Sequence, residues 1–114
     1  MQRQSDGKWF SSEYWSFHIG DELTDKYRLD VDGFRGDGGN ILMTAGNYLH
    51  DGMMFTTYDR DNDLFAGGSC TNPYGSWWFN NCHKVCLTCN GAYHRSYHLS
   101  EGILVNSRMM IKPR

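Results

Sequence analysis

Three aspartates alternate along one short stretch of the sequence, at Asp59, Asp61 and Asp63. Carboxylates two residues apart on a non-helical backbone can converge on one cation, and an oxygen-rich site of this kind suits calcium better than zinc or copper. The alternative is a solvated acidic turn, in which each aspartate accepts hydrogen bonds from the nearby backbone. An EF-hand loop is excluded, because Leu64 stands where that loop needs glycine and Cys70 where it needs its last glutamate.

Four cysteines follow closely, at Cys70, Cys82, Cys86 and Cys89. A tightly grouped, even set forms either disulfides or a metal site, and the paired CxxC…CxxC spacing of zinc ribbons is missing here. Disulfides are therefore favoured over zinc. A Cys70–Cys82 bridge would close a loop of about 13 residues, and a Cys86–Cys89 bridge would be a local brace. No βαβ pattern surrounds the second pair, so a redox motif is less favoured, and disulfides indicate a secreted, extracellular protein.

An aromatic, histidine-bearing segment runs from Trp77 to His83. From residue types alone, His83 is explained more simply by a bond to a neighbouring carbonyl than by a ligand. The pair Trp77 and Trp78 is explained more simply by packing in a small core. The sequence has no GxSxG, HExxH or phosphate-loop motif and no nucleophile with its base, so we predict a binding protein and not an enzyme.

The length, composition and charge of the sequence limit the classes of protein to which it can belong. A length of 114 residues with 39% hydrophobic content suits one compact domain. The 11 basic and 13 acidic residues form no basic stripe, which argues against nucleic acid as a partner. No apolar run approaches the roughly 20 residues that cross a bilayer, and the N-terminal segment lacks the apolar core of a signal peptide. We expect no membrane among the partners.

The elements that position these residues are short, because 13 glycines punctuate the sequence. Alternation predicts strands over Glu13 to Ile19 and Tyr27 to Val31, paired across the turn at 20–26. Further strands are expected at 54–57, 77–79 and 109–112, while 40–44 is either a strand or a helical turn. The expected fold is α+β, a small and mostly antiparallel sheet. A long irregular segment over 59–107 would be braced by calcium and disulfides.

Several segments match motifs of one known family: 17–22 with 25–29, 52–63, 77–83, 90–93 and 109–113. Through them the protein resembles the fibrinogen-related (fibrinogen C-terminal) domains, which include the C-terminal regions of fibrinogen itself, ficolins, tachylectins, tenascins and angiopoietins. The motifs run nearly end to end but match only the C-terminal part of that domain. The resemblance implies a single domain, residues 1–114, that lacks the family's N-terminal subdomain.

The resemblance also implies a calcium site. Its ligands would be the side chains of Asp61 and Asp63 and the backbone carbonyls of Phe65 and Gly67, with Asp59 in a supporting outer position. Calcium would order the loop and need not touch the ligand.

In lectin-like members of the family, a pocket beside the calcium loop recognises acetyl groups. Transferred to this sequence, the pocket would use backbone amide donors around a cis peptide bond between Asn81 and Cys82, and the imidazole of His83 as a further donor. Such a bond costs roughly 3 to 4 kcal/mol, so calcium and a disulfide would have to hold it in place. The implied ligand-binding residues are Tyr74, Asn81, Cys82, His83, Leu99 and Ser100.

Two functions follow from the resemblance. The first is an extracellular, calcium-dependent module of the innate-immune lectin type that binds acetylated glycans, such as those of microbial surfaces. The alternative is a fibrinogen-like module that engages a protein receptor or a peptide. Intact Asp61 and Asp63 favour the first, whereas Leu99 and Ser100, where lectins have an aromatic and then a small residue, leave room for the second. Weak affinity at one shallow site would favour a homo-oligomer.

Overall fold

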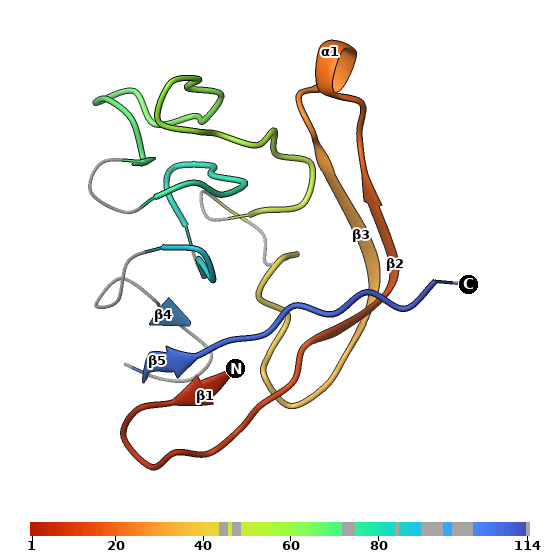
Figure 1. Ribbon diagram of the computed structural model, residues 1–114, viewed down its shortest axis with the longest axis vertical. Helices are drawn as coiled ribbons and strands as arrows, with labels where there is room; N and C mark the ends of the chain where they lie inside the picture. Colours follow the sequence, from red (N-terminus) through yellow and green to blue (C-terminus); the bar gives the residue numbers. More distant parts are fainter. Residues whose placement is uncertain are drawn as a thin grey trace.

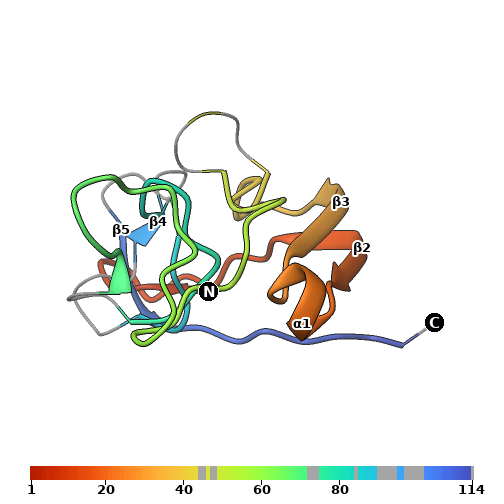
Figure 2. The same ribbon diagram turned by 90° about the horizontal axis from the view of Figure 1, so that it is seen from above.

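The fold consists of two small antiparallel sheets joined by loops (Figure 1). The computed structural model describes residues 1–43, 46, 49–71, 75–83, 85–89, 95–96 and 102–113. Its elements are β1 (Gln2–Arg3), β2 (Glu13–Ile19), α1 (Glu22–Asp25), β3 (Leu29–Arg35), β4 (Arg95–Ser96) and β5 (Gly102–Asn106). One sheet has the order β1-β5-β4 and the other is the β2–β3 hairpin, which lies along one side of the loop-rich part (Figure 2).

The β2–β3 hairpin confirms the first predicted strand pair. Its strands run antiparallel in one register that ends with Ile19 opposite Leu29. The second strand begins at Leu29 and not at Tyr27, because Lys26 and Tyr27 have φ angles of 48° and 57°. These positive angles belong to the left-handed region, which cannot continue a strand.

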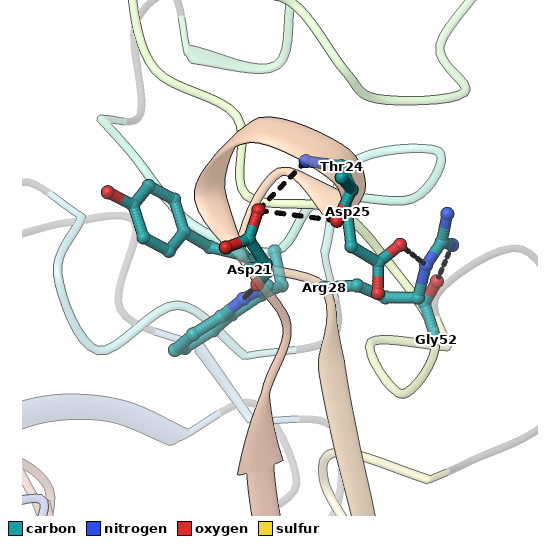
Figure 3. Close-up of polar contacts among 7 residues, drawn as sticks. Asp21, Thr24, Asp25, Arg28 and Gly52 are labelled. Atoms are coloured by element: carbon teal, nitrogen blue, oxygen red, sulfur yellow. Dashed lines mark hydrogen bonds and ion pairs between the residues drawn. The ribbon is translucent and has the colours of Figure 1, made fainter.

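The turn of this hairpin contains the four-residue helix α1, where the sequence predicts only a turn. Asp21 caps the helix, and its Oδ1 accepts a hydrogen bond from the backbone amide of Thr24 at 3.0 Å. Arg28 ties the turn to the next loop, with Nε donating to Asp25 at 2.7 Å and Nη1 donating to the carbonyl of Gly52 at 2.6 Å (Figure 3). The turn is therefore fixed against the rest of the molecule at its base.

Strand β5 pairs with both β1 and β4, so it brings together segments from opposite ends of the sequence (Figure 1). Gln2 lies opposite Asn106 in this sheet. The sequence does not predict this sheet, because both β4 and β5 fall in the segment 59–107, which is expected to be irregular. The strand predicted at 109–112 is wrong: the described residues 107–113 contain no strand, and Met110 is 78% exposed.

The strands predicted at 54–57 and 77–79 reduce to a single antiparallel bridge. Thr56 and Trp77 exchange both backbone hydrogen bonds, at 3.0 and 3.2 Å. Residues 41–43 form a turn, in agreement with the second alternative for that segment, and Thr44 lies outside the described residues.

The core is built around the aromatic segment, where Trp77, Trp78 and Phe79 are all buried. The prediction that the tryptophan pair packs in the core is confirmed. His50 is fully buried beside them, with Nδ1 2.8 Å from the carbonyl oxygen of Trp78 and Nε2 3.3 Å from the amide nitrogen of Val85. An amide can only donate, so Nε2 accepts and Nδ1 carries the proton. His50 is therefore a neutral structural residue that joins two loops.

Candidate functional site

Asp63 organises the acidic loop through backbone hydrogen bonds. Its Oδ1 accepts from the amide of Phe65 at 2.9 Å, and its Oδ2 accepts from the amide of Cys70 at 2.8 Å. Asp61 contributes a weaker bond, with Oδ1 accepting from the amide of Asp63 at 3.2 Å. The loop thus has the hydrogen bonding expected of an acidic turn, and it holds the two carboxylates close together.

The proximity of the two carboxylates has an electrostatic consequence. The pKa of Asp63 is raised, first by burial and further by the charge of Asp61, against the opposing effect of the amides of Cys70 and Phe65. A raised pKa means that the ionised form is disfavoured in its surroundings. A cation between the two groups would remove this penalty.

The donor set fits a hard cation that accepts backbone ligands. Among the described residues, no three His, Cys, Asp or Glu side chains gather into a metal-holding cluster. An ion at Asp61 and Asp63 would therefore need carbonyl oxygens and water as well, which is the ligand mixture that calcium takes. The ring of Phe65 lies over Gly67, where a Cβ would meet it at 2.7 Å, so a larger residue at this position would force that ring to move. The roles of the Phe65 and Gly67 carbonyls stay predictions.

Asp59 forms its hydrogen bond outside the acidic loop that contains Asp61 and Asp63. Its Oδ1 accepts from the hydroxyl of Thr57 at 2.8 Å, and this bond is the main cause of the lowered pKa of Asp59. Thr57 and Arg60 exchange backbone hydrogen bonds at 3.0 Å, which closes a tight turn. Asp59 therefore stabilises the turn that precedes the acidic loop.

All four cysteines form disulfides, and the zinc alternative is wrong. Cys70 is bonded to Cys82, and Cys86 is bonded to Cys89. The second pair is buried, and Thr88 between its cysteines donates a hydrogen bond to the carbonyl of Ser76. This bridge braces the aromatic segment, as expected of a local structural disulfide.

The backbone reverses at Cys82, which has a φ of 59°. The amide of Asn80 donates to the carbonyl of Cys82 at 3.0 Å, so residues 80–82 form a closed turn, which we call the cysteine turn. Asn81 is exposed at its tip, and His83 follows half-buried, with its ring centroid 5.8 Å from that of Phe79. The cis bond expected before Cys82 stays a prediction.

Two backbone donors of the cysteine turn are available. In the described part of the structure, neither the amide of Asn81 nor that of Cys82 has a hydrogen-bond acceptor. Unpaired amides next to an imidazole form a natural site for a ligand carbonyl oxygen. The family resemblance implies amide donors at this place, but residue types alone do not show whether these amides have acceptors within the protein.

The acidic loop and the cysteine turn are physically joined. The amide of Leu64, next to Asp63, donates to the carbonyl of Asn80 at 2.9 Å. Asp63 also holds the amide of Cys70, whose sulfur is bonded to Cys82. A change in the acidic loop can therefore reach the cysteine turn by two routes.

The predicted pocket residues Tyr74, Leu99 and Ser100 lie outside the described residues.

This architecture is shared with a known family. Residues 2–111 match the family described as fibrinogen beta and gamma chains, C-terminal globular domain. The chain is 41% identical over 86 residues to fibroleukin of Bos taurus, a match that covers 74% of this chain and 19% of fibroleukin. It is 38% identical over 101 residues to the fibrinogen beta chain of Gallus gallus, a match that covers 74% of this chain and 20% of that relative. The chain therefore belongs to the fibrinogen C-terminal domain family, whose members are non-enzymatic binding modules.

Solved structures agree with this assignment. The fibrinogen-like globe domain of human ANGPTL2 has a TM-score of 0.65 at 33% identity, and the match covers 76% of this chain and 37% of that one. Lamprey fibrin D-dimer, complexed with the peptide ligand Gly-His-Arg-Pro-amide, has a TM-score of 0.66 at 31% identity, covering 75% and 30%. The resemblance to fibrinogen-related domains is confirmed, although none of the relatives named above is a ficolin or a tachylectin.

The match is partial in length. The chain spans about a fifth of each of the two curated relatives named above. Within the described residues, no helix is both long and apolar enough to cross a membrane.

Proposed function

We propose that this chain is a secreted recognition module that binds a peptide or protein segment at the cysteine turn. The observation that carries the proposal is the pair of unpaired amides at Asn81 and Cys82, in the described structure, beside the half-buried imidazole of His83. A fibrinogen-family structure of 31% identity contains a peptide ligand, which supports a peptide over a glycan. The two disulfides support an oxidising, extracellular setting.

Recognition at this site would be driven by backbone donors. A carbonyl oxygen of the ligand would accept from the amides of Asn81 and Cys82, and the ring of His83 would supply a further polar contact. The disulfide to Cys70 limits the motion of the turn, so little conformational entropy is lost when the ligand binds.

Calcium fits the acidic loop as a structural ion. Asp61 and Asp63 would hold it together with the carbonyls of Phe65 and Gly67, and the ion would supply positive charge between two carboxylates that repel each other. The bond from Leu64 to the carbonyl of Asn80 then transmits the order of the loop to the cysteine turn. Calcium would therefore raise ligand affinity without contacting the ligand.

Binding of an acetylated glycan is the second candidate, because an acetyl carbonyl could accept from the same two amides equally well. Its pocket would need Tyr74, Leu99 and Ser100 as walls. The relatives named above do not support a glycan, so we rank this function below peptide binding.

Isothermal titration of the full chain with Gly-His-Arg-Pro-amide tests the proposal, with and without calcium. We expect binding in calcium, weaker binding in a chelator, and about a tenfold loss for His83→Ala, on the scale of one good polar contact. His18→Ala, which removes an exposed imidazole from β2, is the matched control and should bind as the parent does. Binding of N-acetylglucosamine without any peptide binding would favour the glycan instead.

A further inference from the structure

Aspartate followed by glycine occurs at four places in the sequence: Asp6–Gly7, Asp32–Gly33, Asp37–Gly38 and Asp51–Gly52. In such a pair the backbone nitrogen of the glycine can attack the carboxyl carbon of the aspartate and close a five-membered succinimide ring. Glycine hinders this attack least, because it has no side chain. Whether a given pair reacts depends on the partners that the fold gives to its nitrogen and to its carboxyl group.

In three of the four pairs, both reacting groups have partners elsewhere in the chain. The glycine amides donate to backbone carbonyls, which are Arg3 for Gly7 (2.9 Å), Ser11 for Gly38 (2.7 Å) and Leu29 for Gly52 (2.8 Å). The carboxylates accept from other donors, which are the side chain of Arg3 for Asp6, the amide of Ser11 for Asp37 and the amide of Val31 for Asp51. These bonds keep each nitrogen away from the carboxyl group that it would attack.

The pair Asp32–Gly33 on β3 differs from the other three. The amide of Gly33 donates to Oδ1 of Asp32 at 2.7 Å, so the nitrogen and the carboxyl group that would react are in contact. The amide of Leu29 donates away from β2, to the carbonyl of Met53 at 3.0 Å. Alternate residues of an antiparallel strand direct their amides to the same side, so the amide of Gly33 also takes no part in the β2–β3 hydrogen bonds.

The hairpin needs glycine at this position and cannot protect Asp32 with a bulkier neighbour. Gly33 has a φ of 69°, which L-residues with side chains rarely adopt. A Cβ at residue 33 would also lie 2.7 Å from the Cβ of Trp15, which belongs to β2. Asp32 is exposed, so water reaches any ring that forms there. The structure of the hairpin therefore creates the conditions for the reaction.

We propose that Asp32–Gly33 is a site of spontaneous modification, at which Asp32 becomes isoaspartate through a succinimide. The nitrogen of Gly33 bonds to Cγ of Asp32, the bond from Cγ to the hydroxyl of the protonated carboxyl group breaks, and this hydroxyl leaves with the amide proton as water. Hydrolysis of the ring then adds one water. Opening at Cγ restores aspartate, whereas opening at the main-chain carbonyl carbon gives isoaspartate. No oxidant or cofactor takes part.

The modification would change the hairpin, because isoaspartate inserts the Cβ methylene into the backbone of β3. Every residue of β3 after the insertion then loses its register with β2, beginning with the pair Tyr14 and Phe34 (Figure 1). The hydroxyl of Tyr14 accepts from the amide of the buried Leu42 at 2.9 Å. We therefore expect the modified protein to unfold at a lower urea concentration. The site is separate from the cysteine turn and needs no ligand there.

Ageing of the full chain tests the proposal. The protein is kept in mildly acidic buffer at physiological temperature for several weeks, digested, and analysed by electron-transfer fragmentation, which distinguishes isoaspartate from aspartate at each position. We expect an intermediate that has lost one water at residues 32–33. We also expect about tenfold more isoaspartate at residue 32 than at 6, 37 or 51, because small misplacement of reacting atoms can lower a rate by about a hundredfold. The Asn90–Gly91 pair, outside the described residues, would lose ammonia and is recognised by its different mass.

Two controls separate the fold from the dipeptide. In urea, where the fold is lost, the four sites should react at similar rates, so the excess at residue 32 should disappear. Asp32→Glu keeps the charge but would need a six-membered ring for the same attack, so the loss of water at residues 32–33 should also disappear. Asp30→Glu makes the same change at another exposed aspartate of β3 and should leave the modification of Asp32 as in the parent. Tryptophan fluorescence checks that both variants fold, and the urea comparison needs no variant.

Three results would overturn the proposal. Equal isoaspartate at the four sites in the folded protein, or more at another site than at residue 32, would show that the contact has no effect. An excess at residue 32 that persists in urea would assign the reactivity to the sequence and not to the fold. Isoaspartate at residue 32 in urea but not in the folded protein would mean that the hairpin protects Asp32.

Discussion

Replacing Asp63 by asparagine separates the structural role of this residue from its role in holding a cation. The aspartate uses both carboxylate oxygens, to accept from the amides of Phe65 and Cys70. Asparagine has one oxygen, so one of these two amides must lose its partner. A hydrogen bond to a charged group contributes about 1.5 to 3 kcal/mol. The substitution also removes the repulsion from Asp61, which raises the pKa of Asp63 and offsets part of this loss.

The net loss of unfolding free energy without calcium should therefore be about 1 to 2 kcal/mol. With a urea m-value of about 1.5 kcal/mol/M, the unfolding midpoint falls by about 1 M. In calcium the difference grows, because an ion at about a hundred times its dissociation constant adds about 2.7 kcal/mol to the parent protein and little to Asp63→Asn.

Urea unfolding monitored by tryptophan fluorescence measures both effects, with calcium and with a chelator. Asp59→Asn is the matched control, because it makes the same chemical change where the side chain has one bond, to Thr57, and is exposed. We expect it to cost less than about 0.5 kcal/mol and to keep the calcium response. If calcium stabilises Asp63→Asn as much as the parent, the ion is not held by this carboxylate and the reasoning fails.

Three further predictions concern pH, the second disulfide and the indole bond. Because the folded-state pKa of Asp63 is raised, the stability from its protonated form is present at low pH and lost as pH rises. Calcium affinity, which needs the ionised form, should fall as the pH is lowered, and should start to fall at a higher pH than for an aspartate of ordinary pKa; titration calorimetry at a series of pH values measures this fall. Replacing Cys86 and Cys89 by serine should cost about 2 kcal/mol in urea unfolding and leave the other disulfide intact; an unchanged midpoint would mean that this bridge is not a brace. Trp78→Phe should cost about 1 to 2 kcal/mol in the same assay, since it leaves the carbonyl of Tyr27 without its 2.8 Å donor; a cost near zero would mean that the bond does not support the turn.

The sequence predicts those elements of the fold that depend on neighbouring residues, and not those that depend on distant ones. The β2–β3 hairpin follows from alternating residues on both strands, whereas its start at Leu29 does not, because the left-handed pair Lys26 and Tyr27 depends on Trp78, 51 residues away. The sheet of β1, β5 and β4 cannot be predicted for a similar reason. Gln2 pairs with Asn106, and no local sequence pattern indicates a partner so far along the chain.

In the candidate site, too, some features can be predicted from the sequence and others cannot. Residue types and spacing indicate the carboxylates of Asp61 and Asp63, the disulfides and His83. The family resemblance implies backbone donors around Asn81 and Cys82, but residue types alone do not predict them, because almost any residue has an amide and only the fold decides whether it has an acceptor.

The pairing of Gln2 with Asn106 also constrains the order in which the protein can fold as it is made. When the ribosome has released β1, β2 and β3, it has still not produced the partner of the first strand. The β2–β3 hairpin can form early from neighbouring residues, but β1 must wait for β5, and closing so long a loop is slow. Until then β1 has no partner strand, and the buried side chain of Leu104 on β5 is missing from the core. During synthesis the chain therefore has an unpaired strand until β5 emerges, and unpaired strand edges favour aggregation.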